Sequence, residues 1–140
     1  MAEIAGSDGD LGTRASAITD LVRRETGYRW VGVYQVDSDV VRNLAWSGPA
    51  APAHPIFAVG DGLTGSAIAS RATVVSNDVA SDPRYLTNQE STGSELIVPI
   101  LAGNSVVGTL DVEHGETNAF GPAEQAVFEA VARSLTPLYT

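Results

Sequence analysis

Two apolar segments near the C-terminal end of the chain constrain its fold more than any other feature. They are ELIVPI (residues 95–100) and SVVGTLDVEH (residues 105–114), and Gly103-Asn104 lies between them. Residues rich in β-branched side chains on both sides of a short glycine-containing connection favour an antiparallel hairpin, so the chain should contain an antiparallel sheet. Because proline cannot donate a backbone hydrogen bond, Pro99 predicts a sheet edge or a bulge at its position.

The register of this hairpin decides which side chains share a face. If the Gly-Asn pair forms a tight two-residue turn, Glu95 lies opposite Val112 and points away from Asp111 and Glu113. A three-residue loop, or a bulge that shifts the register by one residue, places Glu95 opposite Glu113 instead. The Gly-Asn pair suits the tight turn, and a glycine can equally supply the positive φ of a bulge, so the turn residues leave both registers open.

Helical periodicity marks both ends of the chain. A first helix is expected between Asp10, which is suited to cap it, and Gly27, which ends it. A second helix is expected over residues 120–135, where Gly-Pro opens it. Residues 78–93 are polar and irregular, with one short helix expected after Pro83. Between these segments the sequence predicts strands over 28–36, 40–47 and 72–77, a short apolar element over 56–59 and one helix over 66–70.

Composition excludes several classes of function. The 140 residues suit one domain, with residues 1–10 predicted to be disordered and residues 11–140 folded. The net charge of −9 disfavours nucleic-acid binding. Cysteine and lysine are absent, which excludes disulfides, thiolate nucleophiles and Schiff-base lysines, and the two histidines disfavour a structural zinc site. We find no basic leader and no membrane-spanning stretch, so we expect a cytoplasmic protein that does not bind membranes. We also expect no cofactor.

Three local patterns suggest chemistry, and two of them have the wrong spacing. The GDGLTG segment (residues 60–65) lacks the glycine spacing and the lysine of a phosphate-binding loop. Ser66, which could be grouped with Asp111 and His114 as a hydrolase triad, lacks the GxSxG turn. Asp111 and Glu113 share one face of their strand. Two such carboxylates can bind a cation, hold a metal, transfer protons or simply face solvent, and the spacing leaves these possibilities open.

The order of the motifs resembles the GAF domain, a small-molecule sensing module. The resemblance runs over about residues 11–136 and rests on GDGLTGSAIAS, VVSNDV, DPRY, SELIVPI, VVGTLDVEH and FGPAEQAVFEAVA. It implies an α+β fold with a central antiparallel sheet of about six strands. The N- and C-terminal helices are then expected on one face and a ligand pocket on the other, roofed by the loops near residues 48–65 and 78–93.

Within that family the chain is similar to the free methionine-R-sulfoxide reductases. The segments RWVGVY, SELIVPI and LDVEH match motifs of these stand-alone GAF proteins. The resemblance implies that Glu95, Asp111 and Glu113 bind the amino group and the polar end of a ligand. It therefore favours the hairpin register that places Glu95 opposite Glu113.

The reaction machinery of those reductases is missing from this chain. Their cysteine positions fall on His54, Thr64 and Asn88, and an imidazole, a hydroxyl or an amide cannot replace a thiolate in sulfoxide reduction. We therefore predict a non-catalytic GAF protein that binds a small molecule with an amine group, such as an amino acid derivative. The alternatives are an enzyme that uses the carboxylates without a thiol, and a dimerisation or interaction module whose pocket is closed.

The predicted ligand site draws on the first strand, the hairpin and the roof loops. It comprises Trp30, Tyr34, Thr64, Asn88, Glu95, Asp111 and Glu113, with no catalytic and no metal-binding residue. Ordinary core packing explains the two aromatic residues equally well. Small residues extend the apolar surface of the last helix, so we expect a homodimer through the terminal helices.

Overall fold

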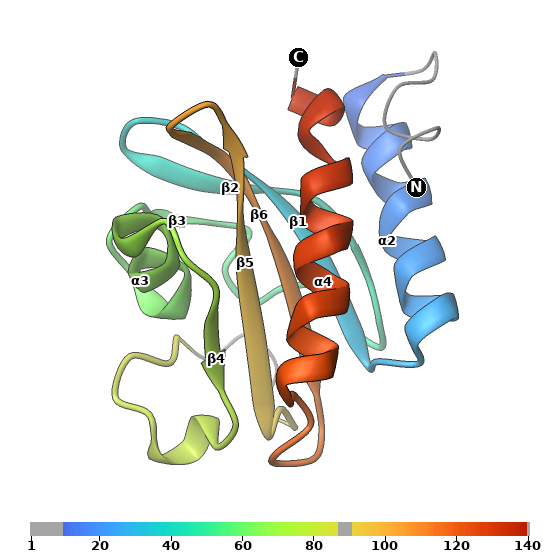
Figure 1. Ribbon diagram of the computed structural model, residues 1–140, viewed down its shortest axis with the longest axis vertical. Helices are drawn as coiled ribbons and strands as arrows, with labels where there is room; N and C mark the ends of the chain where they lie inside the picture. The colour runs from blue at the N-terminus through green and yellow to red at the C-terminus, as the bar shows by residue number, and fades with distance from the viewer. Residues whose placement is uncertain (1–9, 87–90, 140) are drawn as a thin grey trace.

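The computed structural model describes residues 10–86 and 91–139. Within these residues, six strands form one antiparallel sheet in the order β3-β2-β1-β6-β5-β4 (Figure 1). The strands are β1 (Trp30–Val36), β2 (Val40–Ser47), β3 (Ile56–Ala58), β4 (Val74–Ser76), β5 (Ser94–Ala102) and β6 (Ser105–His114). The helices are α2 (Leu11–Thr26), α3 (Gly62–Ser70) and α4 (Pro122–Ser134), with 3-10 turns η1 (Val79–Ser81) and η2 (Thr136–Tyr139). The predicted α+β class and the predicted sheet are confirmed.

The two terminal helices cover one face of the sheet, and α3 lies against the other (Figure 1). Asp10 caps α2, because its side chain accepts a hydrogen bond of 2.7 Å from the backbone N–H of Thr13. Gly27 ends α2 in the left-handed conformation, with φ of 74°. The segment predicted to be disordered was residues 1–10. Asp10 is described, and residues 1–9 lie outside the described residues. No helix in the described ranges combines the length and the apolar character needed to cross a bilayer.

The main core lies between the sheet and the terminal helices. Its fully buried side chains include Ile18 and Val22 of α2, Phe128 of α4, and Leu96, Leu110 and Val112 of the hairpin. Because side chains alternate along a strand, the direction of Leu110 and Val112 turns Asp111 and Glu113 toward the opposite face. The apolar pattern of β6 therefore fixes the face on which its carboxylates lie.

The β5–β6 hairpin contains both a tight turn and a bulge. Ala102 pairs with Ser105 across Gly103-Asn104, but Ile100 pairs with Gly108, so one extra residue of β6 is accommodated between these pairs. From that point the register places Glu95 opposite Glu113, as the family resemblance favoured. The bulge follows Pro99 by one residue, and β4 pairs with β5 only as far as Ile97, so this proline lies beyond the end of its neighbouring strand.

Two local predictions differ from the structure. The helix expected after Pro83 is absent from the described residues there, and the single 3-10 turn of this region, η1, precedes that proline. The chain turns here because Asp82 accepts hydrogen bonds from both the backbone N–H and the guanidinium of Arg84, which favours a compact turn over a helix. Helix α3 begins at Gly62, four residues earlier than expected, so Thr64 belongs to its first turn.

Candidate functional site

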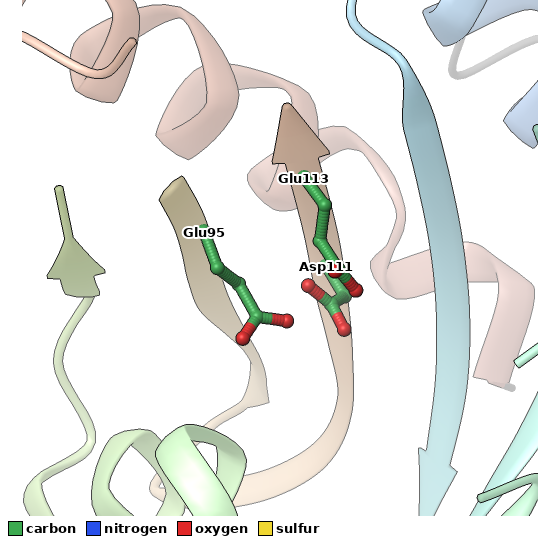
Figure 2. Close-up of side chains that lie close together, drawn as sticks. All are labelled: Glu95, Asp111 and Glu113. Carbon is green, nitrogen blue, oxygen red and sulfur yellow. The ribbon is translucent and has the colours of Figure 1, made fainter. Parts of the chain in front are cut away.

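Three carboxylates meet on the face of the sheet opposite the terminal helices. Glu95 comes from β5 and Asp111 and Glu113 come from β6, and the three side chains point toward one another (Figure 2). One oxygen from each carboxylate lies within 4.8 Å of the others. The exposed fractions of these residues are only 4%, 4% and 1%. We call this group the carboxylate triad.

The hydrogen bonds of the triad are unevenly distributed. The hydroxyl of Thr92 donates a hydrogen bond of 2.7 Å to Oε1 of Glu113. In contrast, Oδ1 of Asp111 is buried and has no hydrogen-bond partner among the described residues. Buried polar atoms are nearly always paired, so an unpaired oxygen on a carboxylate that lines a cavity indicates a place for a donor from outside the chain.

Burial and mutual repulsion disfavour negative charge in the triad. Desolvation, followed by the charges of Asp111 and Glu113, raises the pKa of Glu95 well above its ordinary value. Desolvation and the charge of Glu113 likewise raise the pKa of Asp111. The nearby Tyr34 has a strongly raised pKa, chiefly because it is buried and also because the three carboxylates are close. A cation would relieve these unfavourable interactions.

A small cavity adjoins the triad. It is lined by Tyr34, His54, Phe57, Gly62, Leu63, Thr64, Leu86, Glu95 and Asp111. The volume of this cavity is about 20 Å³, which is room for about one water molecule. The described residues around the carboxylates therefore leave too little space for an amino acid, so a ligand of that size requires some of the lining residues to move.

The structure brings most of the predicted site residues together. Tyr34, Thr64, Glu95 and Asp111 line the cavity, and Glu113 lies beside the last two. Asn88 lies outside the described residues. The sequence did not predict four residues of the site: the cavity-lining Phe57, Leu63 and Leu86, and the hydrogen-bond donor Thr92. An isolated apolar or hydroxyl residue belongs to no motif that would mark it as part of a site.

Trp30 lies on the same face but does not line the cavity. Its indole Nε1 donates to the carbonyl of Ala50 over 2.9 Å, and its side chain is buried. The ring lies across Gly32, where any added Cβ would overlap its six-membered ring. Trp30 therefore packs on the sheet beside the triad and does not contact the cavity. The position of its ring requires a glycine at residue 32.

Comparison with known proteins identifies the family. The family model for the GAF domain matches residues 10–136. The chain belongs to the GAF family. The expectation from the sequence motifs is thus confirmed over essentially the same range.

Proteins with different names are similar to the chain in sequence and in fold. It is 24% identical to GAF domain-containing protein A of Dictyostelium discoideum over 133 residues, which span 94% of this chain and 82% of that protein. It is 27% identical to the free methionine-R-sulfoxide reductase of Escherichia coli K12 over 110 residues, which span 79% of this chain and 66% of that enzyme. The structure of a type II free methionine-R-sulfoxide reductase from Thermoplasma acidophilum superposes with a TM-score of 0.85 at 28% identity, covering 93% and 95% of the two chains.

Proposed function

We propose that this GAF protein is a non-catalytic sensor that binds a small molecule through a primary ammonium group. The observation that carries the proposal is the buried carboxylate triad, in which Asp111 lines a cavity and its Oδ1 lacks a hydrogen-bond partner among the described residues. A primary ammonium group has three N–H donors and one positive charge. It can therefore donate one hydrogen bond to each carboxylate and offset their repulsion.

The absence of cysteine supports a role without sulfoxide reduction. The similar proteins include enzymes named free methionine-R-sulfoxide reductases, and that chemistry requires a thiolate to attack the sulfoxide. This chain has no cysteine, and the resemblance aligns the reductase cysteines with His54, Thr64 and Asn88. The amine-binding part of such a site can persist without the reaction.

Acid–base catalysis is the second candidate function, because the pKa values of Glu95 and Asp111 are raised. A carboxyl group that stays protonated near neutral pH can act as a general acid. The small volume of the cavity among the described residues favours a third possibility, an interaction module without a ligand. Two observations distinguish these alternatives from a sensor. An interaction module binds no small molecule, whereas an enzyme binds its ligand and converts it to a product.

Titration calorimetry with a panel of free amino acids and simple amines tests the proposal. For any compound that binds, its N-methyl, N,N,N-trimethyl and N-acetyl derivatives are compared, because each removes ammonium donors or the charge. We expect the binding affinity to fall progressively across this series. We also expect to recover the ligand chemically unchanged after incubation with the protein. Asp111→Asn should weaken binding roughly 10- to 100-fold, since hydrogen bonds to charged groups contribute about 1.5–3 kcal/mol.

The matched control is Glu25→Gln, which removes one negative charge from an exposed position on α2. This variant should bind like the parent protein. Calcium and manganese chlorides are included in the panel, because the triad could also hold a divalent ion. Binding of only anions, neutral apolar compounds or metal ions would contradict the proposal.

A further inference from the structure

We propose that the carboxylate triad exchanges a proton for the cationic group of its ligand. In the ligand-free protein at least one carboxyl of the triad carries a proton, and an arriving ammonium group expels it to solvent. The inference rests on the proposed function for the identity of the ligand. It adds that the affinity of the site depends on pH and that binding releases protons.

The first argument is the spacing of the carboxylates. One oxygen from Glu95, one from Asp111 and one from Glu113 lie within 4.8 Å of one another, and none of the three residues is more than 4% exposed. Solvent therefore screens their charges poorly. Like charges so close together disfavour full ionisation, and a shared or retained proton is the simplest relief.

The second argument is the absence of a neutralising group among the described residues around Glu95 and Asp111. Neither Glu95 nor Asp111 forms an ion pair with a described residue. The ion pairs found among the described residues are Arg42–Asp37 and Arg84–Asp82. From β1, Tyr34 faces the triad as a neutral phenol. The remaining titratable residue that lines the cavity is His54, which lies in an exposed stretch of the roof.

The electrostatic balance of the site agrees with this arrangement. Burial and the neighbouring charges raise the pKa values of both Glu95 and Asp111. An ammonium group placed among the carboxylates acts in the opposite direction, because a nearby positive charge stabilises the ionised carboxylate. The ligand and the proton therefore compete for the same oxygens, including the unpaired Oδ1 of Asp111.

The exchange balances in atoms and charge. The O–H bond of one carboxyl group breaks, and its proton passes to water or buffer. The ammonium group keeps its three N–H bonds and donates hydrogen bonds to the newly ionised carboxylate. One positive charge enters the site and one leaves it, so the net charge of the buried cluster with its occupant does not change.

Calorimetry in several buffers measures the protons that are released. An amine identified by the panel is titrated at pH 6.5 in phosphate, MES and imidazole, whose heats of ionisation differ. The slope of the observed enthalpy against the buffer ionisation enthalpy gives the number of protons. We expect release of about one proton per amine bound, and an affinity that tightens by up to about tenfold per pH unit between pH 6 and 7.

Glu95→Gln should reduce the proton release to less than half while the protein still binds the amine, because glutamine cannot hold an exchangeable proton. Asp111→Asn provides a second test if the first variant does not fold, and Glu25→Gln should keep the slope of the parent protein. Amine binding without proton release would overturn the exchange and leave the proposed function intact.

Failure of every amine to bind would instead overturn the proposed function, and the proton is then measured directly. Carbon-13 NMR of the carboxyl groups in the ligand-free protein reads their ionisation, with signals assigned through the two triad variants. A carboxyl of Glu95 or Asp111 that titrates only well above pH 5 supports a retained proton. Ionisation of both groups by pH 5 overturns it.

Discussion

The stability of the ligand-free protein should fall as pH rises from 5 to 7, and Glu95→Gln should remove part of that fall. Glu95 and Asp111 have pKa values raised by burial and by their neighbours' charges. Above about pH 4.3 the unfolded chain releases these protons, whereas the raised pKa values mean that the native protein releases them only at a higher pH. The native state then binds more protons than the unfolded state. The stability linked to these groups is complete at low pH and is lost as pH rises through the raised pKa values.

The size of the effect follows from linkage and from the spacing of the charges. Each carboxyl that stays protonated in the native state lowers the free energy of unfolding by about 1.4 kcal/mol per pH unit, or about 2.7 kcal/mol between pH 5 and 7. Two unit charges separated by 4.8 Å repel by about 3.5 kcal/mol at an effective dielectric constant of about 20. Repulsion from one neighbour therefore suffices to sustain the loss over this range, even before burial is considered.

Urea unfolding followed by tryptophan fluorescence at half-unit pH steps measures this slope. The difference between the parent protein and Glu95→Gln cancels contributions from groups elsewhere in the fold. The two proteins should be about equally stable at pH 5, and the variant should be more stable by about 2–3 kcal/mol at pH 7. Glu25→Gln should follow the parent at every pH. If the parent and Glu95→Gln give parallel curves, the triad is ionised throughout and the reasoning is wrong.

Three further predictions concern the packing of Trp30 on Gly32, the absence of sulfoxide reductase activity and the formation of a homodimer. Gly32→Ala should destabilise the protein by about 1–3 kcal/mol in urea, because its Cβ overlaps the buried ring of Trp30, whereas Gly60→Ala meets nothing within 4 Å and should change little. With methionine-R-sulfoxide and dithiothreitol, turnover should equal a protein-free blank, and any clear excess would contradict the non-catalytic assignment. Light scattering at micromolar concentration should show a homodimer that Val127→Glu dissociates, since Val127 of α4 is 51% exposed; a monomeric parent would refute this prediction.

Periodicity and turn residues predicted most of the secondary structure, because they act locally. The caps at Asp10 and Gly27 and the apolar faces of the terminal helices placed α2 and α4 within about two residues of their ends. The start of α3 was missed because Gly62 has a φ of 69°, so the glycines of this segment look like a turn although the helix has already begun. Such an overlap of turn and helix has no distinct sequence pattern.

Long-range contacts were the part that could not be predicted. The hydroxyl of Tyr139 donates to the carbonyl of Tyr34 over 2.6 Å, and an added Cβ on Gly108 would overlap the phenol group of Tyr139. Nothing near Gly108 in the sequence indicates that a C-terminal tyrosine crosses the strand there. The hydrogen bond from Thr92 to Glu113 is of the same kind, since it depends on where the loop before β5 returns to the sheet.

The hairpin register, which the Gly-Asn turn left open, follows from the strand pattern once burial is considered. In the unbulged register Glu95 would pair with Val112 and point into the apolar core beneath the terminal helices, while Leu96 would move to the polar face. A lone carboxylate in an apolar core costs several kcal/mol or forces protonation, whereas a one-residue bulge leaves few backbone groups unpaired. The observed register puts Leu96 in the core and Glu95 beside the other two acids. The alternation of apolar residues that forms the core therefore also places the three carboxylates on one face. The bulge allows this register although the turn has only two residues.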